Sequence, residues 1–262
     1  GLFLMAAWGV PDLVDSLQRR WVKATATAEK GPRWLALPVV VLLLALAVET
    51  RTETRYWRDS ASLFERALEV SPDNHMAHFG LGLMLTHEGK VDEAIGQYQT
   101  TLRLRPDDAR THSNLALLLT GVGKLEEARG HAQEAVRLHP AYPDAHSTLG
   151  VVLDAQGRTE EAIQEYQAAL AIDPDDAQVR NNLGSALAKL GSTDEAIPEF
   201  RSAIRSRPDY ALARRNLARA LFATSRFADA WKEIQESRRL GLDVPADLLR
   251  DLSARVPEPR AP

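Results

Sequence analysis

The chain has 262 residues, of which 45% are hydrophobic and 26% are charged, and its formal net charge at pH 7 is -4. This length is enough for one or two domains with a substantial buried core. The small negative charge supplies no basic field for a polyanion, so no nucleic-acid partner is predicted. The absence of cysteine excludes disulfide bonds, thiolate catalysis and cysteine-ligated zinc.

The first 33 residues consist of an apolar stretch and a polar connector. Residues 1–10 carry no charge, whereas a secretory signal peptide begins with basic residues. We therefore interpret them as the end of a membrane helix whose first part is missing, which predicts that the sequence belongs to a longer protein. The connector that follows, residues 12–33, contains five basic and three acidic residues.

Residues 34–48 form an uninterrupted apolar run, WLALPVVVLLLALAV. The run is shorter than the roughly 20 residues that span a bilayer core. Extension of the helix back through Gly31 and on to Thr52, with flanking arginines reaching the headgroups, gives sufficient length. Trp34, Arg33 and Arg51 are typical of the two ends of a membrane helix. We predict a transmembrane helix over 34–52 that contacts the lipid bilayer; a buried helix of a soluble protein is the alternative.

The basic connector indicates how the predicted membrane helix is oriented. Short loops rich in lysine and arginine stay in the cytoplasm, so the residues after the helix are expected on the opposite side. Arg51, Arg55 and Arg58 follow the helix and argue against this orientation, although acidic residues alternate with them. The predicted localisation is the membrane, with the C-terminal part extracytoplasmic, in the periplasm or a lumen.

The remainder of the chain is an internal repeat with a period of 34 residues. In each unit a leucine precedes glycine or alanine, and a second leucine follows four residues after the first. A breaker residue, glycine or serine, comes next. An alanine then follows, and in every unit but the second a larger residue lies four positions after it. This spacing predicts two amphipathic helices per unit. In the second unit the last pair is Ala128 and Ala132, which predicts a thinner unit. The prolines that close the units are Pro72, Pro106, Pro140, Pro174 and Pro208.

These residues resemble the tetratricopeptide repeat, whose pattern is W-x2-LG-x2-Y, then A-x3-F, then P. The chain departs from this pattern in the first helix, where leucine replaces the tyrosine and polar residues replace the tryptophan. The resemblance implies an all-α fold, a right-handed superhelical solenoid of helix-turn-helix repeats, here preceded by one or two transmembrane helices. The residues at the tryptophan position are His78, His112, His146, Arg180 and Arg214.

Five regions follow from these signals. They are a truncated membrane helix end with its connector (1–33), a transmembrane helix (34–52), a linking helix with a half repeat (53–74), five repeats (75–242, divided into 75–108, 109–142, 143–176, 177–210 and 211–242), and a capping helix with a disordered tail (243–262).

The junction between the predicted membrane helix and the repeats suggests a parent protein. Residues 56–60 read YWRDS, and this arrangement resembles the C-terminal end of polytopic membrane proteins related to the dolichyl-phosphate-mannose mannosyltransferases. The repeats also look like those of O-linked N-acetylglucosamine transferases. An alternative hypothesis is therefore that the chain is the substrate-recruiting region of a membrane glycosyltransferase whose catalytic part is absent from it.

The repeated polar residues do not form a pattern typical of catalysis. His78, His112 and His146 recur at one offset, but packed helices lie about 8–10 Å apart and zinc needs nitrogens near 2.1 Å from one centre. We predict that they pack where other repeats have an aromatic residue. The acidic pairs 107–108 and 175–176 are interpreted as turn and helix N-terminal residues. No catalytic residue, metal ligand or cofactor is predicted in this chain.

The concave groove lined by the first helix of each unit is the candidate binding site, because such surfaces hold extended peptides or partner helices. An amide both donates and accepts hydrogen bonds, so asparagines can hold a peptide backbone without reading its side chains. The resemblance to O-linked N-acetylglucosamine transferases implies this role for Asn114, Asn182 and Asn216, which share one offset; solvated asparagines without a ligand are the alternative. The predicted groove residues are Phe79, Asn114, Leu117, Asn181, Asn182, Arg215, Asn216 and Arg219.

Two arginines add a charged element to this groove. Arg215 and Arg219 are one helical turn apart and can bind an acidic group together. The predicted function is a membrane-anchored, non-catalytic module that binds a protein or peptide in its groove. The oligomeric state is left open by the sequence.

Overall fold

A computed structural model describes residues 60–242 and 244–258. The chain divides into two compact units, Gly1–Ser62 and Leu63–Pro262, and the repeats lie in the second. The described residues form twelve α-helices and no strand. The predicted all-α solenoid is therefore confirmed for this part of the chain.

The predicted membrane helix over 34–52 and the connector over 1–33 lie outside the described residues. No helix of the described part is both long enough and apolar enough to cross a bilayer. The transmembrane helices therefore stay predictions from the sequence.

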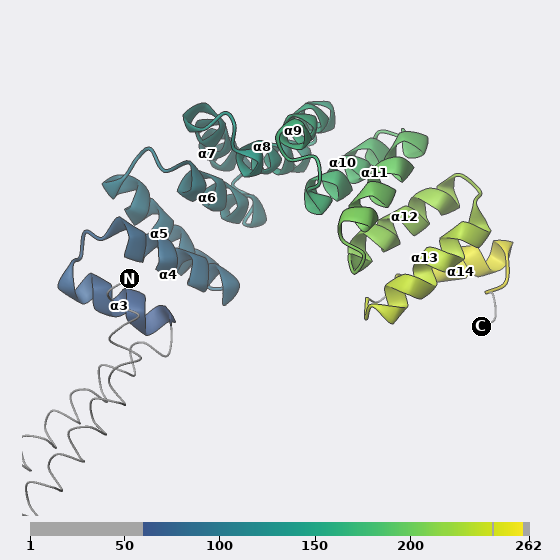
Figure 1. The fold of residues 1–262 in the computed structure, drawn as a ribbon, viewed down its shortest axis with the longest axis horizontal. Coiled ribbons are helices and arrows are strands. Elements are labelled where there is room, and N and C mark those ends of the chain that lie inside the picture. The colour runs from purple at the N-terminus through teal and green to yellow at the C-terminus, as the bar shows by residue number, and fades with distance from the viewer. Residues whose placement is uncertain (1–59, 243, 259–262) are drawn as a thin grey trace, which may run out of the picture. The chain divides into compact units, whose positions relative to one another are not determined.

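The helices form one single helix, five pairs and a terminal helix (Figure 1). In each pair we call the first the A helix and the second the B helix. They are α3 (Ser60–Val70), the pairs α4 (His75–His87) and α5 (Val91–Leu104), α6 (Ala109–Gly121) and α7 (Leu125–Leu138), α8 (Pro143–Ala155) and α9 (Thr159–Ile172), α10 (Ala177–Lys189) and α11 (Thr193–Ser206), α12 (Ala211–Ala223) and α13 (Phe227–Arg239), and α14 (Ala246–Arg255).

The pairs, called units one to five from here on, stack in chain order. Each A helix packs against its own B helix, and the B helices of units one to four also pack against the A helix that follows. Neighbouring A helices touch from α6 onward, whereas among the described residues neighbouring B helices do not approach to this extent. Because the A helices lie closer together, the stack curves toward them. We call the surface of the A helices on this side the A face.

The core within a unit depends on a small residue of the A helix that faces a large one of the B helix. A Cβ atom added to Gly150 would lie 2.6 Å from the ring of Tyr166, and one added to Gly184 would lie 2.8 Å from the ring of Phe200. In unit two the small residue is Ala116, and the equivalent B-helix position holds the buried Ala132. The size of one residue therefore limits the size of the other.

Unit two, which its alanines predict to be thin, is the unit whose B helix buries only alanines. Ala128, Ala132 and Ala135 are the buried residues of α7. The A helices on either side of it, α6 and α8, approach each other along more of their length than the other neighbouring A helices do. The close approach of α6 and α8 thus coincides with small buried side chains on the B helix α7.

The turns use residues that satisfy the helix ends. The A-to-B turns of units one to four have glycine with φ between 74° and 86°, a left-handed conformation, and Ser225 adopts it in unit five with φ 61°. The side chains of Asn74, Asp108 and Asp176 accept hydrogen bonds from the first-turn amides of α4, α6 and α10. The interpretation of the acidic pairs as turn and N-terminal residues is confirmed for Asp108 and Asp176.

Helix α14 packs against the last B helix. Its Leu248 and Leu252 are buried in a cluster with Trp231 of α13, and the Trp231 Nε1 donates a hydrogen bond to the carbonyl oxygen of Val256 at 3.0 Å. An ion pair of 2.9 Å joins Arg238 to Glu258. Residues 256–258, which follow the capping helix in the predicted region 243–262, are thus held against α13 and are not disordered.

Candidate functional site

Two rows of side chains follow the A face, because residues 34 apart occupy equivalent positions on successive A helices. The outer row is solvent-accessible: Leu83 is 44% exposed and Leu117 is 43% exposed. The inner row is more covered, and Ser113 and Asn181 are each only 3% exposed. The outer row is Leu83, Leu117, Val151, Ser185 and Arg219, and the inner row is Phe79, Ser113, Ser147, Asn181 and Arg215.

Two of the predicted asparagines bond to each other across a unit boundary. The Nδ2 of Asn216 donates to the Oδ1 of Asn181 at 2.9 Å and approaches the Oγ of Ser185 at 3.4 Å. The bond joins α12 to α10, and Asn181 is nearly inaccessible. Asn181 therefore holds units four and five together and leaves little surface for a ligand.

The other two predicted asparagines, Asn114 and Asn182, are half-buried. The offset that they share with Asn216 is interrupted in units one and three. At Gly80 any Cβ atom would overlap the ring of Phe64 from α3, so an asparagine does not fit. In unit three the position holds Thr148, which is 4% exposed. The asparagines thus form separate positions and not a continuous ladder, and their binding role stays a prediction.

A hollow of about 310 Å³ opens between α10, α11 and α12. Asn216 and Arg219 both line it, so the structure brings two of the predicted groove residues together. The aromatic ring of Phe200 and small side chains form the rest of the surface. The complete lining is Ser185, Ala188, Thr193, Phe200, Asn216, Arg219, Ala220 and Ala223.

The C-terminal end of the A face is positive. Helices α10 and α12 together contain five basic residues and no acidic residue. Arg214 is paired with Glu233 at 2.9 Å, whereas neither Arg215 nor Arg219 pairs with an acidic group of the described chain. Two guanidinium groups one helical turn apart are thus available for an acidic ligand, although the whole chain is negative.

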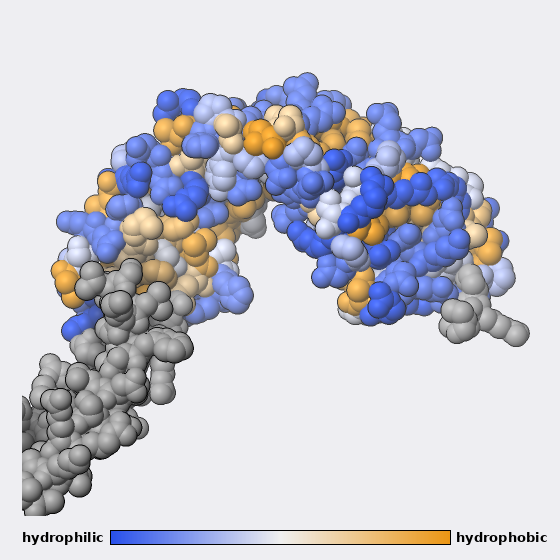
Figure 2. Space-filling model, viewed as in Figure 1, coloured by the Kyte–Doolittle hydropathy of each residue, from blue (hydrophilic) through white to orange (hydrophobic). Residues whose placement is uncertain are grey.

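The N-terminal end of the A face is apolar. Helix α4 contains no aspartate, glutamate, lysine or arginine. The ring of Phe79 lies 6.0 Å from that of Tyr98, and the guanidinium of Arg110 lies 5.2 Å above Phe79. On the side of the molecule seen in Figure 2, hydrophobic residues gather over α4 to α6, and hydrophilic residues cover most of α10 to α13.

A repeated hydrogen-bonded bridge, which was not predicted from the sequence, lies behind the A face. In every unit the residue at the tryptophan position donates to the carbonyl oxygen of the proline six residues earlier, at 2.9–3.0 Å. The same side chain contacts a polar B-helix residue 19 positions later at 2.7–2.9 Å. The bridges are His78 to Gln97, His112 to His131, His146 to Glu165, Arg180 to Glu199, and Arg214 to Glu233.

These bridges correct the packing role predicted for the three histidines. Their rings do lie between the two helices of a unit, but their nitrogens make specific polar contacts. The 19-residue spacing between the paired positions is visible in the sequence and could have identified the bridges. No group of three histidine, aspartate or glutamate side chains in the described part of the chain is arranged to hold a metal ion.

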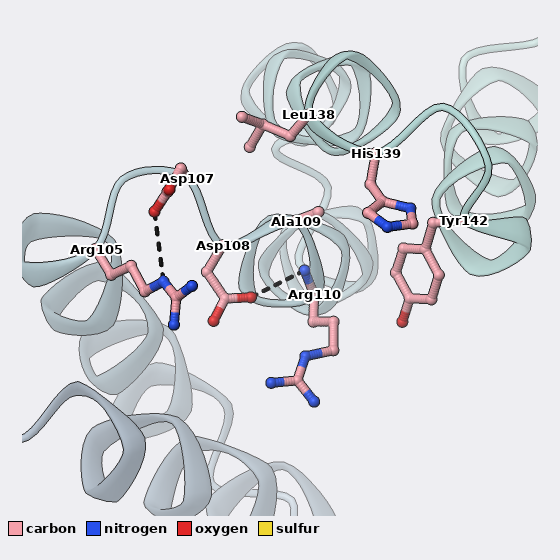
Figure 3. A pocket seen from close by; sticks show the side chains of 8 residues that line it. All are labelled: Arg105, Asp107, Asp108, Ala109, Arg110, Leu138, His139 and Tyr142. Atoms are coloured by element: carbon pink, nitrogen blue, oxygen red, sulfur yellow. Dashed lines mark hydrogen bonds and ion pairs between the residues drawn. The ribbon is translucent and has the colours of Figure 1, made fainter.

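A second hollow, of about 290 Å³, lies where the turns before α6 and α8 meet (Figure 3). Its acidic groups already have partners: Asp107 pairs with Arg105 at 3.4 Å, and Asp108 accepts from the backbone amide of Arg110 at 3.1 Å. Burial, and then a neighbouring carboxylate, raise the pKa of Tyr142 to about 12. The phenol therefore stays protonated at neutral pH, and no catalytic chemistry is assigned to this hollow.

Models of one family match most of the repeat region. One tetratricopeptide repeat model matches residues 53–109 and 181–241, and a second matches residues 109–139. A TPR repeat model matches residues 154–191. The chain is a tetratricopeptide repeat protein. Such repeats generally act as non-catalytic scaffolds. None of the curated proteins compared with this TPR protein matches it.

Solved structures share the fold. YrrB, described as a TPR protein with an unusual peptide-binding site, is 20% identical, and the match covers 74% of this chain and 99% of YrrB with a TM-score of 0.54. A chain of the APC/C Cut9–Hcn1 hetero-tetramer is 22% identical, and the match covers 81% of this chain and 42% of the other with a TM-score of 0.69. The Pseudomonas aeruginosa protein pilF is 20% identical, and the match covers 69% of this chain and 83% of pilF with a TM-score of 0.63. At these identities the likeness establishes the fold alone.

Proposed function

We propose that this TPR protein binds a segment of another protein along its A face and has no catalytic activity. The observation that carries the proposal is the exposure of Leu83 and Leu117 at equivalent positions of consecutive A helices. Single exposed leucines are common on protein surfaces, but apolar residues that recur along one face mark interaction sites. Asn114 lies on α6 together with Leu117, and Asn182 lies on α10; the amides of both can bind the backbone of the ligand.

The proposal includes attachment to a membrane through residues 34–52 and an extracytoplasmic location of the repeats, both of which rest on the sequence alone. The hypothesis of a glycosyltransferase parent also rests on the sequence resemblance, because the matched family models are all tetratricopeptide repeat models. The peptide-binding site named for YrrB agrees with the use of this fold for peptide binding.

A peptide library tests the proposal on the full chain. We expect a random 12-residue phage library to yield peptides that bind the immobilised protein, and fluorescence anisotropy then measures their affinity. Leu117→Glu should weaken binding at least tenfold. Leu104→Glu is the matched control, because Leu104 is 38% exposed but lies at the end of a B helix, and it should change binding less than threefold. Failure to enrich any peptide, or equal binding by Leu117→Glu, would overturn the proposal.

A further inference from the structure

Resting on the proposed function, we infer that the A face has a direction: it takes an extended segment with apolar residues over units one to three and acidic residues over units four and five. Leu83, Leu117 and Val151 lie in the outer row of the first three units, and Ser185 and Arg219 complete it. The inner row begins with Phe79 and also ends with an arginine. The outer row is therefore apolar over units one to three, the inner row is apolar at unit one and polar from unit two on, and both rows end with an arginine in unit five.

The basic end favours carboxylates because two of its arginines, Arg215 and Arg219, have no acidic partner within the described chain. The nearby acidic side chains of the B helices are used elsewhere: Glu199 pairs with Arg180, and Glu233 pairs with Arg214, each at 2.9 Å. Arg215 and Arg219 are thus left to face a ligand. Guanidinium groups bind carboxylates through two parallel hydrogen bonds, which makes acidic residues the chemistry that fits.

The hollow next to Arg219 has a lining suited to a polar chain end or side chain. Asn216 uses its Nδ2 for Asn181, so its Oδ1 can still accept a hydrogen bond. Ala220 and Ala223 leave room beside the guanidinium because their side chains are short. A carboxylate at Arg219 would therefore have space and a neighbouring amide.

The same end disfavours basic ligands. Lys189 of α10 is held by Asp154 of α8 at 2.9 Å, and Arg180 of the same helix pairs with Glu199, so both acidic groups that form ion pairs with α10 in the described chain are already neutralised. A lysine-rich segment would approach two free guanidinium groups and gain no partner. The face thus selects by repulsion as well as by attraction.

The spacing sets a minimum length for the ligand. Packed helices lie about 8–10 Å apart, so three steps from unit two to unit five amount to roughly 25–30 Å. An extended chain advances about 3.3 Å per residue, so roughly eight to nine residues separate the ligand residue over Leu117 from the ligand residue over Arg219.

Labelled 14-residue peptides test the direction by fluorescence anisotropy with the full chain. One carries phenylalanine and leucine at one end and glutamate at the other, and is made in both sequence directions. A shuffled peptide of the same composition and a version with lysine in place of glutamate are the comparisons. We expect the block peptide in one of its two sequence directions to bind at least tenfold more tightly than the shuffled peptide and the lysine version. High salt should weaken the binding of this block peptide.

Charge-reversal variants complete the test. Arg219→Glu should weaken binding of the block peptide at least tenfold and strengthen binding of the lysine version. Arg201→Glu is the matched control, since Arg201 is exposed on the B helix α11 and the change in net charge is the same; it should change binding less than threefold. Equal binding of block and shuffled peptides, or equal effects of the two variants, would overturn the direction.

The two proposals fail in distinguishable ways. If library peptides depend on Leu117 but the block and shuffled peptides bind alike, the A face is a binding surface and only its direction is refuted. If no peptide depends on Leu117, the proposed function is refuted, and the direction is refuted with it.

Discussion

The Nδ1 atoms of His112 and His131 lie 2.9 Å apart, with ring centroids at 5.1 Å. The Nε2 of His112 donates to the carbonyl oxygen of Pro106, so its Nδ1 is an acceptor when the ring is neutral, and His131 donates to it. If both rings were protonated, two N–H groups would face each other. Burial, and then the nearby His112, lower the pKa of His131 below its usual 6.5, although Glu127 acts in the opposite direction.

Acidification should therefore destabilise unit two. The pKa of His131 is lower in the folded state than in the unfolded state. Between these two pKa values the unfolded chain binds more protons than the folded chain, so stability is lost as the pH falls through this range. His131→Gln should reduce this loss, since Gln97 occupies the equivalent position and contacts His78 at 2.7 Å. Urea midpoints at pH 7.5 and 5.5 check the prediction, and equal pH dependence of the two proteins would contradict it.

The period of the chain predicted the helix pairs because the apolar stripe, breaker and proline of each unit lie within 34 consecutive residues. The partners across unit boundaries could not be predicted in this way. Asn216 bonds to Asn181, 35 positions away, and this pairing depends on how α10 and α12 approach each other. Likewise, the glycine at position 80 fits because the ring of Phe64, which belongs to the different helix α3, leaves no room for a Cβ atom there.

The fit between Gly150 and Tyr166 makes a stability prediction. Gly150→Ala should lower the free energy of unfolding by about 1–3 kcal/mol, because the added Cβ atom overlaps the ring and overpacking strains the core. Gly130→Ala is the control of opposite sign: Gly130 is inside α7 with no atom near its Cβ position, so alanine should stabilise by about 0.5–1 kcal/mol.

A compensating change tests the origin of that effect. Unit five combines buried Ala218 with buried Ile234 at the equivalent positions. Adding Tyr166→Ile to Gly150→Ala should therefore recover part of the loss in urea unfolding. If Gly150→Ala destabilises equally with either residue at position 166, the fit is not the cause.

The N-terminal cap of α10 makes a second stability prediction. The Asp176 carboxylate accepts hydrogen bonds from the amides of Gln178 at 2.8 Å and Val179 at 3.0 Å. Asp176→Ala should cost about 1 kcal/mol, because these amides then lose their partner. Asp175→Ala removes a carboxylate of the same turn that caps nothing, and should change stability by less than about 0.5 kcal/mol. Equal effects in urea unfolding would show that charge, and not capping, matters here.

The bridge of Arg180 makes the final prediction. Its Nε donates to the carbonyl oxygen of Pro174 and its Nη1 to the Oε2 of Glu199, both at 2.9 Å. Arg180→Leu keeps the apolar volume but removes both bonds. The side chains of Arg180 and Glu199 are 22% and 25% exposed, so water screens part of their interaction. We therefore expect Arg180→Leu to lower the free energy of unfolding by about 1–2 kcal/mol.

Arg180→His tests whether the hydrogen bonds are the cause. In unit three His146 makes both equivalent contacts, to Glu165 at 2.7 Å and to the carbonyl oxygen of Pro140 at 3.0 Å. The histidine variant should therefore keep most of the stability at pH 6, where an imidazolium can donate from both nitrogens. Arg205→Leu on the exposed side of α11 is the control and should have little effect in the same urea titration. If the leucine and histidine variants unfold alike, the position contributes through packing and not through its bridge.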